Sequence, residues 1–181
     1  SLGYIEEVKQ VLDEIDLVPL EKFVQKLKIV TSLNSTIFTA GCGGGNQLAG
    51  HLAEDLISYL LNKDVKPIKS MQLGLNLGLL TAISNDYSFD NIYEEELRVF
   101  AQFGDALVLF SGSGNSKVLI KSAEWANNFG ITVISFTGFD GGRLRELSDI
   151  HINIPSRSWA IIHSLQSLLF HIALDKYIRK I

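Results

Sequence analysis

Apolar residues along this chain follow two periods, one typical of helices and one typical of buried strands. From residue 5 to residue 27 they recur at helical spacing with a break near Pro19, which predicts two N-terminal helices. Residues 36–40 then form a short β-prone run that ends in glycines, and helical spacing resumes over 46–61. This region is therefore predicted to be a strand, a glycine turn and a helix.

Further apolar runs of strand type follow, each leading into a helical segment, and they occupy residues 105–110, 131–136 and 150–154. Continuous apolar strands that alternate with helices are typical of a parallel sheet covered on both faces. We therefore predict an α/β fold, a three-layer α/β/α sandwich around a central parallel sheet. Because no linker divides the chain, residues 1–181 are predicted to form a single domain. Residues 1–33 supply helices that pack on the domain or in an oligomer, and residues 34–181 form the core and the C-terminal helix.

The composition favours a domain that works on small molecules. The chain has 181 residues, of which 46% are hydrophobic and 20% charged, enough for one domain with a core. A net charge of -4 gives no broad basic field, so we expect no nucleic-acid or membrane partner. With one cysteine, Cys42, no intramolecular disulfide can form. No apolar run of about 18 residues and no signal-like N-terminal stretch is present, so we expect a cytoplasmic protein.

The segment SGSGNS, residues 111–116, has the composition of an anion site. Ligands of parallel sheets bind beyond the carboxyl ends of the strands, where this segment is expected to lie. It offers hydroxyl groups and backbone amides at the start of a helix, which is what a phosphate needs. A serine cap on a glycine turn is the simpler alternative, but a cap needs one serine and three are present. The segment lacks the endings of a P-loop and of a dinucleotide fingerprint, so it predicts a phosphorylated metabolite and no nucleotide cofactor.

Histidines and a carboxylate form a second candidate group. In the stretch GCGGGNQLAGHLAED, residues 41–55, His51 and Asp55 lie one helical turn apart and can converge on a metal or a substrate. A surface contact is the alternative for such a pair. The glycines before them permit either close approach of a ligand or an unstrained turn. His163 and His171 lie on the last predicted helix, where a histidine is usually a core residue unless folding brings it a partner.

Three segments together resemble the sugar isomerase (SIS) domain family, and within it the phosphoheptose isomerases that act on sedoheptulose 7-phosphate. GCGGGNQLAGHLAEDL is similar to the family pattern GNGGSxxxAxHxAxEL, and AISNDYSFDNIY is similar to AIxNDYGFxxxF. FSGSGNSKVLIKSAEWANNFGITVISFTGFDGG is similar to STSGNSxNVxxAxxxAxxxGxxxIxLTGxxGG. The resemblance covers about Ile37 to Ile178 and implies the SIS fold, with a flavodoxin-like, nucleotide-binding-type topology. It also implies a cytoplasmic enzyme of bacterial heptose synthesis for surface polysaccharide.

The resemblance implies a set of residues that contact the substrate and its phosphate: Gly44, Gly45, Asn46, Asp86, Ser111, Gly112, Ser113, Asn115 and Ser116. Of these residues, Ser113 and Ser116 are the ones most expected to contact the phosphate. Gly112 stands where the family has threonine, and Gly45 stands where it has serine, with Asn46 next to it as a replacement polar group. For Asp86 the alternative is an ordinary turn aspartate.

The resemblance also implies an acid-base pair. Asp55, which replaces a family glutamate, would be the base, and His171 would be the acid. Aldose-ketose isomerisation moves a proton between C1 and C2 through an enediol, so it needs a base near carbon and a proton donor near the carbonyl oxygen. Loss of one methylene displaces the base by about 1 Å, which can cost about a hundredfold in rate.

Some family members hold a zinc ion, and the corresponding positions here are His51, Asp55, His163 and His171, all of residue types that bind zinc. However, eight helical residues rise about 12 Å, too far for both histidines of a straight last helix to reach one ion. Either that helix is irregular, or the two histidines serve different subunits. The resemblance implies a homotetramer with sites between subunits, which agrees with the second explanation.

Two functions follow from the sequence. The first is a phosphosugar isomerase that interconverts ketose and aldose phosphates. The second is a non-catalytic SIS module that binds a phosphosugar as a regulator, or binds a protein. Departures from the family pattern favour the second function. They are Gly45 and Gly112, named above, Ile161, where the family has arginine, and Ser164, where it has glutamate. Histidines at 51, 163 and 171 favour the first.

Overall fold

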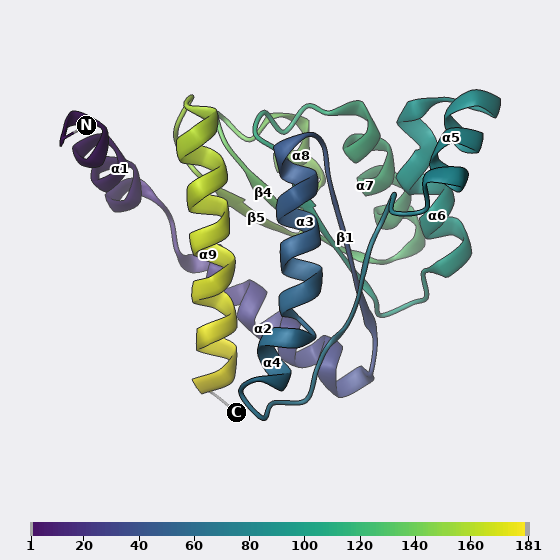
Figure 1. The fold of residues 1–181 in the computed structure, drawn as a ribbon, viewed down its shortest axis with the longest axis horizontal. Coiled ribbons are helices and arrows are strands. Elements are labelled where there is room, and N and C mark those ends of the chain that lie inside the picture. The colour runs from purple at the N-terminus through teal and green to yellow at the C-terminus, as the bar shows by residue number, and fades with distance from the viewer. Residues whose placement is uncertain (1, 180–181) are drawn as a thin grey trace.

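The structure is a computed structural model that describes residues 2–179, and at its centre lies a parallel sheet (Figure 1). The strands are β1 (Thr36–Gly41), β2 (Lys69–Gln72), β3 (Ala106–Phe110), β4 (Thr132–Thr137) and β5 (Ile150–Asn153). They are ordered β2-β1-β3-β4-β5, and every neighbouring pair is parallel. The predicted parallel sheet is therefore confirmed.

Helices cover both faces of the sheet, because strand side chains alternate between two apolar cores. Phe110 and Phe136 stack at 4.9 Å between ring centres on one face, while Leu107 and Leu109 point to the other. The first face carries α2 (Val18–Leu33), α3 (Gly44–Asp55), α4 (Ser58–Leu61) and α9 (Trp159–Arg179). The second carries α5 (Leu77–Asp86), the 3-10 turn η1 (Phe89–Asn91), α6 (Ile92–Phe100), α7 (Lys117–Phe129) and α8 (Gly142–Leu147). The three-layer α/β/α prediction is confirmed.

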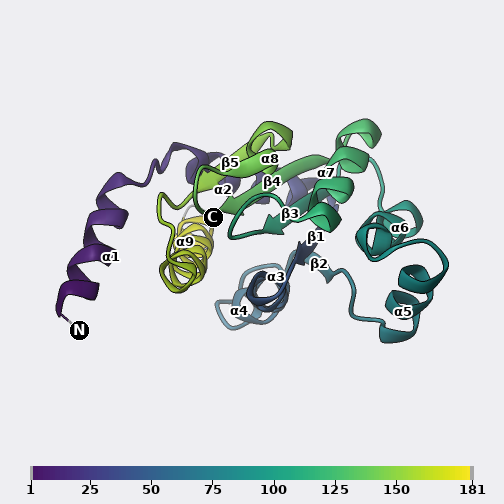
Figure 2. The ribbon, with the colours of Figure 1, turned by 90° about the horizontal axis from the view of Figure 1, so that it is seen from above.

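The two predicted N-terminal helices behave differently. α2 packs into the first core through Phe23 and Leu27, whereas α1 (Leu2–Glu14) extends away from the body in both views (Figures 1 and 2). On α1 Val11 is buried, but Leu2 and Ile5 are exposed. Packing of this helix in an oligomer stays a prediction.

The region between the first and second predicted strands holds elements that the apolar pattern does not predict. β2 adds a fifth strand at the edge of the sheet, and its residues are polar or only partly buried, so it lacks a continuous apolar run. The helix predicted over 46–61 is divided into α3 and α4 by a turn at Leu56 and Ile57. Within the described residues, none of the helices combines the length and apolar character needed to cross a membrane.

Candidate active site

The candidate site lies between α3 and α9, which run side by side on one face of the sheet (Figures 1 and 2). Two side chains hold α9 in place. The Gln166 amide is fully buried and donates to the carbonyl oxygens of Ser111 and Phe136, at the ends of β3 and β4, at 3.2 and 2.9 Å. The Tyr59 hydroxyl donates to Asp175 Oδ1 at 2.7 Å and so ties α4 to the last part of α9. These bonds fix the facing surfaces of the two helices.

The glycine turn that precedes α3 is built by close backbone contacts. Gly43 has a φ of +58°, in the left-handed region that favours glycine. A Cβ atom on Gly45 would lie 2.5 Å from the carbonyl oxygen of Phe110, and one on Gly41 would overlap the backbone of Gly45. A serine at 45, as in the family pattern, has no room in this backbone. These two glycines therefore serve the turn itself.

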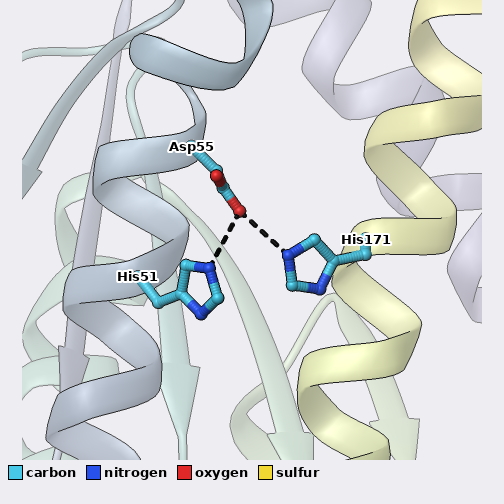
Figure 3. A group of neighbouring side chains, drawn as sticks. All are labelled: His51, Asp55 and His171. Carbon is cyan, nitrogen blue, oxygen red and sulfur yellow. Dashed lines mark ion pairs between the residues drawn. The ribbon is translucent and has the colours of Figure 1, made fainter.

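Three predicted residues converge across the two helices, as Figure 3 shows. His51 Nε2 lies 3.4 Å from Asp55 Oδ2, and His171 Nε2 lies 3.1 Å from the same oxygen. The two imidazole rings are 4.9 Å apart, and Phe170 packs against both. The pair at positions i and i+4 of α3 thus meets the partner from α9 that the acid-base prediction requires.

The hydrogen bonds of His171 fix its tautomer when the ring is neutral. Its Nδ1 lies 2.7 Å from the carbonyl oxygen of Ser167, which can only accept, so Nδ1 carries the proton. Nε2 then directs a lone pair at the carboxylate of Asp55. Two electron-rich atoms at 3.1 Å repel each other unless a proton or a metal ion lies between them. The arrangement therefore requires a proton, on either Nε2 or Oδ2, or a metal ion between the two atoms.

Asp55 is a buried carboxylate, with an exposed fraction of 7%. Its Oδ2 is buried and makes no hydrogen bond of normal geometry to any described residue. Burial raises the pKa of Asp55, and the nearby imidazoles of His51 and His171 lower it by less. A carboxylate with a raised pKa is a stronger base, which is the property that proton abstraction from carbon needs.

The same three side chains offer a possible metal site. Among residues 2–179, His51, Asp55 and His171 each contribute a ligand atom, and these atoms lie within 4.8 Å of one another. Two imidazole nitrogens and one carboxylate oxygen form a donor set typical of zinc. The unbonded Asp55 oxygen and the fixed tautomer of His171 also fit a metal, because both leave lone pairs aimed at the same space.

His163 does not join this group within the described chain. It lies two turns earlier on α9, where a Cβ atom on Gly44 would be 2.7 Å from its Cε1 atom. Its ring centre is 6.1 Å from that of Trp159, and burial lowers its pKa. The structure thus brings three of the four predicted zinc ligands together and places the fourth beside the glycine turn.

The predicted phosphate loop, residues 111–116, connects β3 to α7 and is held by its own hydrogen bonds. Ser111 is 3% exposed, and its Oγ accepts from the amide of Gly114 at 2.9 Å. Asn115 Oδ1 accepts from the amide of Arg143 at 3.0 Å, and its Nδ2 donates to the carbonyl of Ser113 at 3.1 Å. Ser111 and Asn115 therefore shape the loop with the polar atoms that were predicted to contact phosphate.

Ser116 remains available for an anion, and Ser113 in part: its Oγ already accepts from the amide of Asn115 at 3.2 Å, and its hydroxyl hydrogen is left to donate. Both are partly exposed, and Ser116 precedes α7 without using its side chain as a cap. The first amides of a helix have no partner within the helix. In α7 the amide of Leu119 donates to the carbonyl of Ser116 at 3.0 Å, so those of Lys117 and Val118 are the ones that an anion would use. This is the geometry of a phosphate site at a helix N-terminus.

The other predicted contacts lie apart from the group in Figure 3. Asn46 accepts from Gln72 Nε2 through both its carbonyl oxygen and Oδ1, at 2.8 and 3.0 Å. Asp86 is exposed at the end of α5 and accepts from Asn85 Nδ2 at 2.9 Å. α5 lies beyond the β2 edge of the sheet (Figure 2) and packs in the second core, and Asp86 is not part of the group that Asp55 forms with His51 and His171.

Sequence reasoning missed Trp159, the first residue of α9. Its six-membered ring lies directly on Gly112, so that any Cβ at position 112 would overlap the ring. The sequence did contain an indication of this contact, because Gly112 stands where the family has threonine. However, Trp159 lies 47 positions later, and the two residues come into contact only when the chain folds.

A cavity of about 530 Å³ lies elsewhere, between α3, β2, α5 and α6. Its lining includes Glu54, Gln72 and Glu96, but none of the residues predicted for the site. The candidate site therefore rests on the residue group in Figure 3 and the serine loop.

Known proteins resemble this chain in sequence and in structure. The family model described as the SIS domain matches residues 3–138. A phosphoheptose isomerase from Bordetella avium is 33% identical over 178 residues, which cover 97% of this chain and 88% of that protein. One from Mycobacterium tuberculosis is 36% identical over 135 residues, which cover 75% of this chain and 68% of that protein.

Among solved structures, phosphoheptose isomerase GmhA from Neisseria gonorrhoeae superposes with a TM-score of 0.88 at 26% identity, covering 99% of this chain and 97% of that one. Sequence and structure thus point to the same set of relatives.

Proposed function

This chain belongs to the SIS domain family, and from that premise we propose that it is an aldose-ketose isomerase that converts sedoheptulose 7-phosphate into D-glycero-D-manno-heptose 7-phosphate. The relatives named phosphoheptose isomerase span nearly the whole chain. The observation that carries the proposal is the buried Asp55 carboxylate with His171 at 3.1 Å.

The two residues suit the two proton transfers of the reaction. Asp55 removes a proton from C1 of the ketose, while protonated His171 donates to the oxygen on C2, which gives the enediol. Asp55 then returns its proton to C2, and His171 takes the proton from the oxygen on C1. The products are the aldose and the starting protonation states of both residues.

Ser113, Ser116 and the first-turn amides of α7 hold the phosphate in this proposal. They supply binding energy away from the reacting carbons, and so they orient C1 and C2. Ser111 and Asn115 contribute by keeping the loop in shape.

As the alternative to the metal-free acid-base pair, we propose that His51, Asp55 and His171 hold a zinc ion, in which case Asp55 and His171 would be metal ligands and not the free base and acid. When bound, zinc would supply Lewis acidity toward the oxygen atoms of the substrate. His163 then serves the site of another subunit in a homotetramer, in agreement with its distance along α9 from His171. We expect this enzyme in the cytoplasm.

One structural feature favours the second candidate, a phosphosugar-binding module without catalysis. Ile161 stands where the family pattern has arginine, and it is fully buried in the core. Binding of phosphosugar without turnover would support this candidate.

Metal analysis of the purified protein, together with an assay on sedoheptulose 7-phosphate, tests the proposal. We expect turnover, its loss in His171→Ala, and phosphosugar binding that survives this substitution. Absence of turnover with metal supplied, on several phosphosugars, would rule out the isomerase.

A further inference from the structure

Aromatic rings gather at the start of α9, beside the serine loop. The ring centre of Trp159 lies 5.4 Å from that of Phe139, which follows β4, and 6.1 Å from that of His163. Trp159 covers Gly112 of the serine loop, and His163 covers Gly44 of the glycine turn. The first two turns of α9 therefore border the space between the two loops with rings.

Gly112 and Trp159 depend on each other. A Cβ atom at position 112 would overlap Cζ3 and Cε3 of the indole, so every other residue here must displace the ring. The indole is packed on the loop backbone, yet 53% of Trp159 remains exposed. One part of the ring is thus fixed by the loop and the remainder is open beside the predicted phosphate site.

Phe139 supports the indole from an unusual backbone conformation. Its φ is +52°, which is uncommon for a bulky residue and is kept only where the surroundings enforce it. The Phe139 amide donates to the carbonyl of Ser156 at 2.9 Å, and its carbonyl accepts from Asn153 Nδ2 at 3.2 Å. These contacts hold the ring of Phe139 against Trp159.

We propose that Trp159, supported by Phe139, is a platform on which the C–H face of the sugar packs while its phosphate occupies the serine loop. The inference rests on the proposed function, because it needs a phosphosugar in that loop. Aromatic side chains suit this role, since their faces are apolar and weakly negative and sugar C–H groups are apolar and weakly positive. The platform makes Trp159 a specificity residue that favours phosphorylated sugars over inorganic phosphate.

Tryptophan fluorescence reports on the platform without any turnover. The chain has two tryptophans, and Trp125 lies on α7 with its ring stacked on Phe129. In Trp125→Phe all tryptophan emission comes from Trp159. We expect sedoheptulose 7-phosphate to change this emission in a saturable way, and inorganic phosphate to change it much less. Emission that stays constant while calorimetry detects phosphosugar binding would overturn the platform.

Substitutions separate packing against the sugar from the shape of the loop. Trp159→Ala should weaken phosphosugar binding about tenfold, as expected for losing one apolar contact surface. The inhibition constant of inorganic phosphate should stay unchanged, and Trp159→Phe should recover part of the loss. Trp125→Phe is the matched control and should bind as wild type does. An equal loss for phosphosugar and phosphate, or no loss for either, would overturn the proposal.

Gly112→Ala provides the complementary perturbation, because it displaces the ring. Its effect on phosphosugar binding should not add to that of Trp159→Ala in the double variant. Full additivity would contradict the contact. If the enzyme turns over and Trp159→Ala changes neither its kinetics nor its binding, the platform is rejected and the proposed isomerase is kept. If phosphosugar binding depends on Trp159 but no turnover is detected, only the isomerase is rejected. If no phosphosugar binds, both the platform and the isomerase are rejected.

Discussion

Asp55→Asn is the substitution that separates chemistry from stability most clearly. The side chain keeps its shape but loses its negative charge and can no longer accept a proton from carbon. A positioned general base contributes about 10²- to 10⁴-fold to rate, so we expect kcat to fall by that factor. KM should change little, because the proposed phosphate contacts lie on the loop before α7 and not on α3.

Stability should change in the opposite direction. Burial raises the pKa of Asp55 above its usual 3.8, so the folded protein binds a proton more readily than the unfolded chain. Stability is then lost as the pH rises from 3.8 through the folded pKa, and the cost of the buried charge is complete above that pH. In Asp55→Asn the charge is removed, and the new amide can donate to Nε2 of His171.

The magnitude follows from the unbonded oxygen. Asp55 Oδ2 is buried, and its close polar neighbour is His171 Nε2 at 3.1 Å. In metal-free protein with a neutral His171, this nitrogen carries no proton and the oxygen is left without a donor, which costs about 1–3 kcal/mol. Asp55→Asn removes this cost, which should raise the melting temperature of metal-free protein by about 2–4 °C for each kcal/mol. Thermal unfolding after chelation, at pH 7, measures this gain.

Glu54→Gln is the matched control, because Glu54 precedes Asp55 on the same helix but is exposed and bonded to Ser58. It should keep the wild-type kcat and melting temperature. A kcat of Asp55→Asn close to that of wild type would refute the assignment of Asp55 as the base. A melting temperature well below that of wild type would refute the reasoning on the unbonded oxygen.

Three further outcomes are expected. Ser113→Ala should raise KM by about 10- to 100-fold, as for a hydrogen bond to a charged group. Ser111→Ala should instead cost about 1–3 kcal/mol of stability, because the Gly114 amide loses its acceptor in a buried position, whereas the Asn115 amide that Ser113 accepts is exposed and can bond to water. Steady-state kinetics and urea unfolding distinguish the two. Glu96→Gln should stabilise the protein at pH 7 but not below pH 4.5. Burial raises the pKa of Glu96 above 4.5, so the wild-type protein loses stability as the pH rises and the carboxyl ionises. Urea unfolding at both pH values shows whether the variant is stabilised only at the higher pH. Zinc at about 100 times its Kd should stabilise the wild type by about 2.7 kcal/mol, and His51→Ala should lose most of this gain in thermal unfolding.

The sheet was largely predictable from the sequence where burial is complete. The strand predicted over 131–136 lies at Thr132–Thr137, because a strand buried on both faces needs a continuous apolar run. β2 was not predicted, because it is an edge strand with the sequence KSMQ. It has neither a continuous apolar run nor a clear alternation of apolar and polar residues.

The candidate site was predictable in part. His51 and Asp55 follow from their spacing on one helix, which is local information. His171 was assigned through the family resemblance, since its approach to Asp55 depends on how α9 packs against α3. The contact between Trp159 and Gly112 also depends on how α9 packs, so no local sequence pattern could predict it.

Isomerisation in deuterated water tests the central claim most directly. Zinc-supplied protein is incubated with sedoheptulose 7-phosphate, and the product is followed by NMR. We predict an aldose phosphate that carries solvent deuterium at C2, because Asp55 exchanges its proton with solvent during the life of the enediol, and we predict no product from Asp55→Asn or His171→Ala. Absence of product from the wild-type protein, or product formed by Asp55→Asn at the wild-type rate, would contradict the account.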